Sequence, residues 1–386
     1  SSEVVVSEMG LGTQRWGSTD FNAPDEALCH RFLDMAVEAG VNLVDTAEQY
    51  PIPSDPLQGK PEGSTESIIG SWLKKKPGRR SELVIASKIT GGPNVNARNI
   101  RRDIEGSLKR LGTDYLDSYL LHWPARYTPQ ANWGQSLQYR HEVEGVSSFQ
   151  NAASFEEIAA TMGALIKEGK LRSYGMCNDN AVGLCLTAAA ADQLGVPRPA
   201  VMQNDFSLID RRAEENGVSE AASARHLNCG FMAYNVLAGG VLTGKYLDEP
   251  AAVDNVDQKA GRERLNNPRG RMDEFGWGRT LYRYRSSAAL DAASRYAKLA
   301  KQAGMPLTEL ALRWCRERRL VTSALVGVTS EAQLRSNLAV YQKGPLPDDL
   351  LWEIDRVHMR NRLPIFSNDR VGKDWDGEGV IGELIP

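Results

Sequence analysis

Cysteine is scarce in this sequence, and its positions form no pattern. The cysteines are scattered and odd in number, which gives neither a framework of paired disulfides nor a C-x-x-C metal motif. Free cysteines are typical of a reducing compartment, so we expect the cytoplasm. The chain begins with Ser1 and has no initiator methionine, so an organelle stroma or matrix after removal of a transit peptide is the alternative. The cysteines are Cys29, Cys177, Cys185, Cys229 and Cys315.

The sequence also lacks a long apolar run, a strong charge and a metal motif. No apolar stretch approaches the roughly 20 residues that cross a bilayer, so we expect no membrane partner. A formal net charge of -3 gives no basic field for nucleic acid. The histidines are dispersed, without a His-x-His pair. We therefore expect no metal site, and a metal-dependent barrel hydrolase is a remote alternative.

What the sequence does contain is a regular alternation of short β-rich runs and amphipathic helical stretches. The expected strands are residues 9–12, 43–45, 83–88, 118–122, 173–177, 200–203, 230–234 and 323–326. The expected helices are residues 24–39, 65–75, 97–111, 154–168, 181–194, 212–226, 288–303 and 331–341. Eight strand-then-helix units predict a parallel sheet that closes into a (β/α)8 TIM barrel. A doubly wound sheet is the alternative, but Gly10-Leu-Gly-Thr-Gln-Arg-Trp-Gly17 does not supply its G-x-G-x-x-G phosphate turn.

Three long segments fall outside this alternation, at residues 123–153, 245–287 and 360–386. The first two follow strands, so we expect long loops on the C-terminal face of the barrel, where active sites lie. An additional helix is expected over residues 348–359. We expect one domain over residues 1–386, with a core of about 9–360 and a tail, 361–386, for which disorder is the favoured interpretation.

Polar residues stand at the ends of three consecutive expected strands. Asp45 ends the second strand, Lys88 the third and His122 the fourth, and Tyr50 lies in the loop after Asp45. In a barrel these strand ends converge. A buried Lys88 ammonium would stabilise a Tyr50 phenolate and lower the phenol pKa, while Asp45 would keep Lys88 charged. A neutral His122 could orient a carbonyl oxygen, so the four residues predict proton transfer during carbonyl reduction.

Each of these residues has an ordinary structural interpretation when it is taken alone. Asp45 could be a turn residue, Lys88 an exposed loop residue and His122 a core histidine. Those interpretations predict no particular placement on consecutive strands, whereas proton-transfer chemistry does. We therefore favour the catalytic interpretation.

Motifs along nearly the whole chain carry a family resemblance. They are Gly10-Leu-Gly-Thr13, Asn42-Leu-Val-Asp-Thr-Ala-Glu-Gln-Tyr50, Ile85-Ala-Ser-Lys88, Leu108-Lys-Arg-Leu-Gly-Thr-Asp-Tyr-Leu-Asp117, Leu121-His-Trp-Pro124, Tyr174-Gly-Met-Cys-Asn178, Gln203-Asn204, Gly239-Gly-Val-Leu-Thr-Gly-Lys-Tyr246 and Gly327-Val-Thr-Ser-Glu-Ala-Gln-Leu-Arg-Ser-Asn337. In this order they resemble the aldo-keto reductase superfamily, and within it the Tas-type and potassium-channel β-subunit-like branch.

The resemblance implies a barrel that binds NADP(H) without a Rossmann domain. Asp45, Tyr50, Lys88 and His122 match the family's catalytic tetrad, and a small carbonyl compound would be the substrate. The residues that match family cofactor positions, or stand beside them, are Gly12, Thr13, Asp45, Cys177, Asn178, Gln203, Tyr234, Asn235, Leu237, Gly239, Leu242, Lys245, Arg271, Val326, Gly327, Thr329, Gln333 and Asn337. Asn178 and Gln203 would bind the nicotinamide carboxamide, and Tyr234 would stack on its ring.

Three positions depart from the family pattern in two places. Gly327 and Gln333 stand where many relatives carry Lys and Arg. NADPH is still favoured over NADH, but with less support than those cations would give. Cys177 stands where a serine is usual, and a thiol is a weaker hydrogen-bonding group than a hydroxyl. A redox-sensing role for Cys177 is a hypothesis.

Aromatic residues after the first and fourth strands are expected to form the substrate pocket, together with Tyr50 and His122. They are Trp16, Trp123 and Tyr127. An aromatic pocket without an obvious cation favours apolar or aromatic carbonyl compounds. The alternative function is that of a cofactor-sensing binding protein of the channel β-subunit type with slow chemistry. Neither the physiological substrate nor the oligomeric state follows from the sequence.

Overall fold

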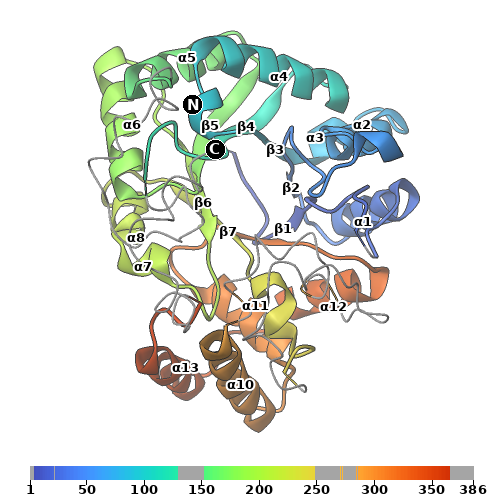
Figure 1. The fold of residues 1–386 in the computed structure, drawn as a ribbon, viewed down its shortest axis with the longest axis vertical. Helices are drawn as coiled ribbons and strands as arrows, with labels where there is room; N and C mark the ends of the chain where they lie inside the picture. Colours follow the sequence, from blue (N-terminus) through green and yellow to red (C-terminus); the bar gives the residue numbers. More distant parts are fainter. Residues whose placement is uncertain are drawn as a thin grey trace.

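Eight parallel strands close into a barrel in which neighbours in the sheet are neighbours in the chain (Figure 1). The strands are β1 (Met9–Gly12), β2 (Leu43–Asp45), β3 (Val84–Ile89), β4 (Leu116–Leu121), β5 (Leu171–Cys177), β6 (Val201–Asp205), β7 (Gly230–Tyr234) and β8 (Ser323–Val326). β1 pairs with both β2 and β8, and these pairings complete the closure. The computed structural model describes residues 4–20, 22–128, 152–247, 270, 272, 284 and 286–365. The predicted (β/α)8 barrel is therefore confirmed.

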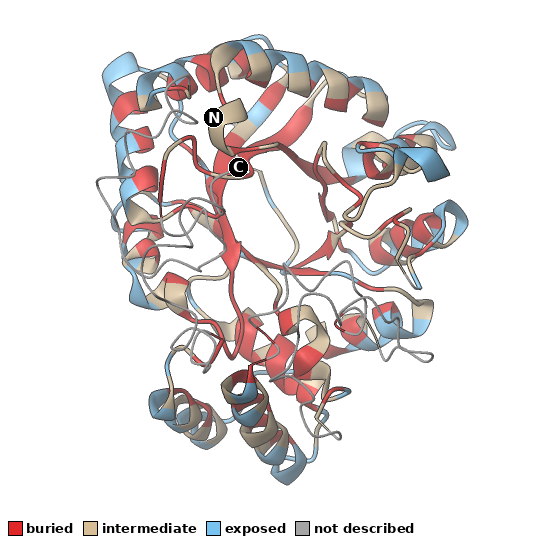
Figure 2. Cartoon of the chain, in the orientation of Figure 1, coloured by how far each residue is buried: buried red, intermediate tan, exposed pale blue. Residues whose placement is uncertain are grey.

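Helices surround the barrel, and most of them have a buried face and an exposed outer face (Figure 2). They are α1 (Glu26–Glu38), α2 (Ser64–Lys74), α3 (Arg79–Glu82), α4 (Ala97–Leu111), α5 (Phe155–Lys167), α6 (Ala181–Leu194), α7 (Arg212–Glu215), α8 (Val218–Ala222), α10 (Ser287–Gln302), α11 (Leu307–Glu317), α12 (Glu331–Tyr341) and α13 (Asp348–Arg360). Short 3-10 helices follow β2, β3 and β7, namely η1 (Pro56–Gln58), η2 (Gly92–Asn94) and η6 (Ala238–Thr243). None of the helices in the described ranges is long and apolar enough to cross a membrane.

Apolar side chains from seven of the strands fill the barrel interior. This inner cluster consists of Leu43, Val84, Ala86, Leu120, Cys177, Val201, Met232 and Leu325. β1 contributes Gly10, where an added Cβ would lie only 2.8 Å from a Leu325 methyl carbon. Val4 and Val6, which precede β1, pack against the same cluster. They close the amino end of the barrel, so the opposite, carboxyl end is left for the polar residues.

Two expectations about the helices were wrong. The single helix expected over residues 212–226 is divided into α7 and α8. Gly217 between them has a φ of 86°, a left-handed conformation that a continuing helix cannot contain. The second error is α11, which was not expected at all. Its buried residues include Leu307, Leu310 and Trp314, so α11 covers the barrel next to β8, and α10 lies outside it beside α13 (Figure 1).

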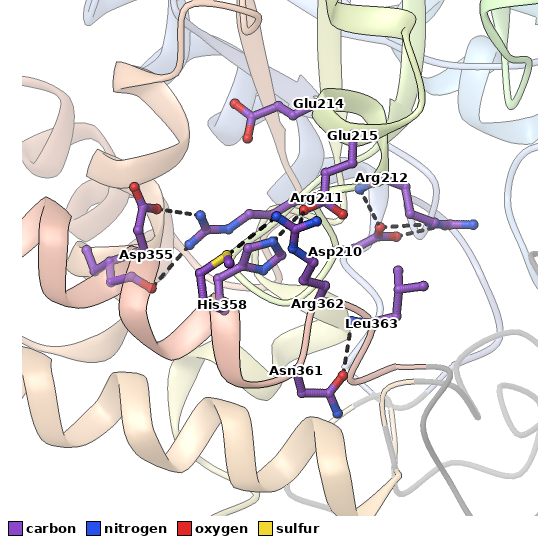
Figure 3. Close-up of polar contacts among 12 residues, drawn as sticks. Asp210, Arg211, Arg212, Glu214, Glu215, Asp355, His358, Asn361, Arg362 and Leu363 are labelled. Atoms are coloured by element: carbon purple, nitrogen blue, oxygen red, sulfur yellow. Dashed lines mark hydrogen bonds and ion pairs between the residues drawn. The ribbon is translucent and has the colours of Figure 1, made fainter.

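The trailing helix α13 is held to the barrel by charged contacts with the segment after β6 (Figure 3). Arg211 is buried, donates to Asp355 at 2.6 Å and lies over the Trp314 ring at 4.5 Å. His358 of α13 lies 2.7 Å from the Glu215 carboxylate. Burial and the nearby Arg211 lower the pKa of His358 below its ordinary value. The additional helix expected after the barrel is therefore present and anchored.

The loops after β4 and β7 lie at the carboxyl end of the sheet, as expected. The structure describes the first residues of the loop after β4 as far as Thr128, and η6 with its flanks after β7. Most of the rest of both inserts, and most of the tail, lie outside the described residues. The other strands and helices that were expected agree with the structure to within two residues at each end.

Candidate active site

A buried ion pair lies at the carboxyl ends of β2 and β3. The Lys88 ammonium is 2.7 Å from the Asp45 carboxylate and donates a second hydrogen bond, of 2.8 Å, to the carbonyl oxygen of Thr46. Lys88 is 0% exposed and Asp45 is 4% exposed. A charge so deeply buried needs a partner of opposite charge, and each of these two residues supplies it to the other.

Tyr50 and His122 complete the group of four residues. The Lys88 ammonium lies 5.1 Å from the centroid of the Tyr50 ring. The rings of Tyr50 and His122 meet edge to face, with centroids 5.7 Å apart. The amide of Gly63 donates to the Tyr50 carbonyl at 2.8 Å, which fixes the loop that carries the phenol. The four residues therefore come together from β2, β3 and the two loops after β2 and β4.

His122 is a neutral imidazole at physiological pH. Burial lowers its pKa well below the ordinary value, and the Lys88 ammonium lowers it further. Among the described residues, no group hydrogen-bonds to the buried Nδ1 of His122. A neutral ring can donate a hydrogen bond from one nitrogen while the other accepts one.

The side chains expected at the nicotinamide form a hydrogen-bonded chain that reaches the ion pair. Gln203 donates from Nε2 to Asp45 at 2.8 Å, and the Cys177 thiol donates to the side-chain oxygen Oε1 of Gln203 at 3.5 Å. Asn178 donates from Nδ2 to the His122 carbonyl at 2.9 Å. The Tyr234 hydroxyl donates to the side-chain oxygen Oδ1 of Asn178 at 2.5 Å. The sequence did not predict these bonds, which join the expected cofactor residues to the four residues above.

Cys177 is enclosed at the end of β5. Burial is the main reason that its thiol pKa is raised far above the ordinary value. Because the thiolate is the reactive form of cysteine, such a thiol is a poor nucleophile. The structure therefore gives the redox-sensing hypothesis no accessible thiolate to act through.

The loop after β7 has an unusual backbone. Asn235, Ala238, Gly239 and Gly240 all have positive φ angles, of 54°, 49°, 62° and 101°. Successive backbone amides in such turns can point into one concavity that suits an anion. Lys245 lies against this turn, since a Cβ added to Gly240 would be 3.2 Å from its Nζ.

Two leucines expected in this loop differ in their surroundings. The carbonyl of Leu237 accepts hydrogen bonds from the amides of Gly240 and Leu242, at 2.8 and 3.2 Å. The Leu242 side chain is buried in the hydrophobic core, so only its backbone is available to a ligand. Arg271, the other cation expected here, lies outside the described residues.

The edges of β1 and β8 form the remaining side of the barrel mouth. Gly12 and Gly327 approach each other closely, and Val326 is buried beside them. Thr13 donates from its hydroxyl to the Asp45 carbonyl at 2.8 Å. These contacts place the first βα turn directly beside the buried ion pair.

The first turn of α12 carries the residues expected at the adenosine. The amide of Thr329 donates to the Gln333 side-chain carbonyl at 2.9 Å, and the Ser330 hydroxyl caps the helix by accepting from the Gln333 amide. Asn337 lies one turn further along and is buried. The Gln333 side chain therefore already binds one of the amides that an anion at this helix end would use.

The aromatic residues expected in the substrate pocket have different environments. The Trp123 ring stacks on His122, with centroids 6.2 Å apart, and the Tyr127 side chain is buried in the same loop. Trp16 is 1% exposed and packs against Phe32 in the core. Its side chain is therefore a core residue and not part of an open wall.

Two features at the barrel mouth were missed. Glu48 accepts a hydrogen bond of 2.5 Å from the Thr90 amide, which ties the loop after β2 to the end of β3. Arg126 and Asp179 form an ion pair between the loops after β4 and β5. The sequence signal for this ion pair was two oppositely charged residues, Arg126 shortly after Trp123 and Asp179 directly after Asn178.

Comparisons with known proteins agree with this architecture. The model of the aldo/keto reductase family matches residues 8–358. Protein tas of Escherichia coli (strain K12) is 33% identical over 383 residues, covering 94% of this chain and 97% of the relative. An aldo-keto reductase of Babesia bovis is 32% identical over 74% of this chain and 99% of its own length. The uncharacterized oxidoreductase YrpG of Bacillus subtilis (strain 168) is 27% identical over 86% of each chain.

Proposed function

The chain belongs to the aldo/keto reductase family and is an oxidoreductase, and from this premise we propose that it reduces aldehydes or ketones to alcohols with NADPH. The observation that carries the proposal is the group formed by Tyr50, His122 and the buried pair of Lys88 and Asp45. This group provides a phenol beside a cation, which is the arrangement that general-acid catalysis by tyrosine requires.

The residues at the barrel mouth fit a nicotinamide cofactor, which the family generally uses. The positive-φ turn after β7, with Lys245 beside it, supplies backbone amides and a cation for a pyrophosphate. Asn178 and Gln203 present amide groups beside the tetrad, and the half-buried Tyr234 presents an aromatic ring. When bound, the cofactor would supply the hydride.

The protein's own groups would manage the proton. The Tyr50 hydroxyl would donate its proton to the substrate carbonyl oxygen as that oxygen becomes an alkoxide. The Lys88 ammonium would stabilise the phenolate that remains, and Asp45 would hold Lys88 in its charged form. A neutral His122 would hydrogen-bond to the same carbonyl oxygen and orient it.

The loop after β4 supports apolar or aromatic carbonyl compounds as substrates. Trp123 lies against His122 and Tyr127 follows in the same loop, so an apolar group attached to the carbonyl carbon would meet aromatic surface. Aromatic surface favours flat or apolar groups because their burial removes area from water.

The test is the variant Tyr50→Phe, with Tyr174→Phe as a matched control. Tyr174 is also a buried tyrosine, and its hydroxyl has no hydrogen-bond partner among the described residues. In assays of NADPH oxidation with a panel of aromatic aldehydes, we expect Tyr50→Phe to lower kcat by about 100-fold to 10,000-fold. NADPH should bind this variant nearly as tightly as the wild type, and the control should retain its activity.

Two results would contradict parts of this proposal. A Tyr50→Phe variant as active as the wild type would exclude Tyr50 as the acid. Tight NADPH binding by the wild type without consumption in any assay would favour the cofactor-sensing alternative. The same panel with NADH tests the cofactor preference, since Gly327 and Gln333 leave the expected 2′-phosphate site without its usual cations.

A further inference from the structure

A partly buried ion pair joins the loop after β4 to the turn after β5 at the barrel mouth. Arg126 donates from Nη1 and Nη2 to the two carboxylate oxygens of Asp179, at 2.9 and 2.6 Å. We propose that Arg126 and Asp179 are positioning residues. Their ion pair holds the substrate wall, formed by Trp123 and Tyr127, at a fixed position relative to Asn178, the residue proposed to bind the nicotinamide. This inference rests on the proposed reductase function.

The pair is built as a rigid two-pronged contact. Parallel hydrogen bonds between a guanidinium and a carboxylate fix both the distance and the orientation of the two groups. Asp179 is 1% exposed and Arg126 is 26% exposed, so the carboxylate is the enclosed partner. The same Arg126 also donates to the Asn180 side chain at 3.1 Å and lies 5.5 Å from the Phe155 ring.

The surrounding residues accommodate the carboxylate and extend the contact. Asn180 caps α6 by accepting from the Gly183 amide, and its own amide nitrogen donates to the Thr128 hydroxyl at 3.2 Å. A Cβ on Gly183 would lie 2.3 Å from the Asp179 carboxylate, so glycine leaves the space that the acid fills. Asn204, at the end of β6, donates to the Asp179 backbone carbonyl at 2.8 Å. Three successive strand ends are thus joined at Asp179.

The location of the pair gives it a consequence for the reaction. Arg126 lies between Trp123 and Tyr127, the two aromatic residues assigned to the substrate wall. Asp179 directly follows Asn178, which has a positive φ of 56° and donates to the His122 carbonyl. A shift of either loop would therefore change the distance between the bound carbonyl compound and the nicotinamide. Neither side chain of the pair needs to touch a reacting atom for this effect.

The experiment compares three variants at the pair with one variant at a second buried carboxylate. Arg126→Met removes the cation, Asp179→Asn removes the charge of the acid, and the double variant removes both. The control is Arg172→Met. Arg172 contacts a fully buried carboxylate, Asp117 at 2.8 Å, which also pairs with Arg80 at 2.7 Å, and it joins the same two strands at their opposite, amino ends.

For Arg126→Met we expect kcat/KM for carbonyl reduction to fall by about 100-fold and NADPH binding to weaken by about 10-fold. Amide hydrogen exchange should accelerate in residues 122–128 and 178–183, which cover the loop after β4, the turn after β5 and the first residues of α6. Arg172→Met should lower the unfolding midpoint while its kinetic constants stay within about twofold of the wild type.

The double variant separates positioning from folding. Arg126→Met alone leaves a buried acid without its cation and is expected to be the least stable of the set. The double variant lacks that unpaired charge, so it should recover stability while kcat/KM stays low. Recovery of full kcat/KM in the double variant, or unchanged exchange in both loops of Arg126→Met, would overturn the proposal.

The exchange and NADPH-binding measurements do not depend on turnover. If the wild type binds NADPH but reduces no carbonyl compound, the proposed reductase function fails. In that case faster loop exchange and weaker NADPH binding in Arg126→Met would still support the positioning role, and their absence would refute it.

Discussion

Replacing Lys88 with methionine removes the ammonium that neutralises the Asp45 carboxylate. Methionine is unbranched and of similar length, so the substitution should fill most of the space without adding a clash. Asp45 would keep the hydrogen bond from Gln203 at 2.8 Å, but it would lose its charged partner in a site that is almost completely closed to water. The expected result is a large loss of stability.

The magnitude follows from the geometry. At a separation of 2.7 Å, an effective dielectric constant of about 20 gives a gross attraction of about 6 kcal/mol. The desolvation of both groups offsets part of this attraction, and breaking a buried pair on one side costs about 3–5 kcal/mol. Changing Asp45 to Asn at the same time removes the unpaired charge. The double variant should therefore be more stable than Lys88→Met by at least about 2 kcal/mol.

The assay is equilibrium unfolding in urea at neutral pH, followed by circular dichroism, for the wild type, both single variants and the double variant. A Lys88→Met variant within about 1 kcal/mol of the wild type would refute the reasoning, since it would mean that water reaches the Asp45 carboxylate. A double variant no more stable than Lys88→Met would do the same, because the cost would then arise from packing and not from the unpaired charge.

Further predictions concern pH and thiol chemistry. His122 and His358 both have pKa values lowered by burial. As the pH falls below about 6.5, these histidines therefore bind protons in the unfolded chain before they do so in the folded chain. The free energy of unfolding should decline from pH 6.5 towards pH 5, and His358→Gln should reduce the slope in urea titrations; an unchanged slope would contradict the assignment. Cys185 is exposed, while burial raises the thiol pKa of Cys229 to about 12 and that of Cys177 still higher. A thiol reagent should modify the native protein rapidly at one site, and Cys185→Ser should abolish that fast phase; fast labelling of Cys177 would show that its enclosure at the end of β5 is incomplete.

Much of the architecture could be predicted because it depends on local patterns. Short β-rich runs ended in polar residues, and helical stretches ended in glycines such as Gly112 and Gly195, which have the positive φ that terminates a helix. Counting eight such units was enough to predict the barrel. The convergence of Asp45, Lys88 and His122 then followed, because a barrel brings the carboxyl ends of consecutive strands together.

Local patterns misled where they were ambiguous. The apolar residues of 212–226 have helical spacing, but Gly217 adopts a left-handed turn that the spacing does not reveal. The helix α11 was overlooked, although its buried residues also have helical spacing. Trp16 follows β1 and was therefore expected in the pocket, yet it is buried in the hydrophobic core, where its ring packs on Phe32 of α1.

The sequence by itself therefore determined the barrel and the residue types at its mouth, because strand and helix periodicity and strand order depend on neighbours in the chain. Only the tertiary structure decided which side chains form hydrogen bonds or ion pairs with one another. The bond from Gln203 to Asp45 joins residues 158 positions apart, and the pair of Arg126 and Asp179 joins residues 53 apart. These residues become partners because the closed sheet brings them within a few ångströms of each other, and their spacing along the chain does not predict that contact.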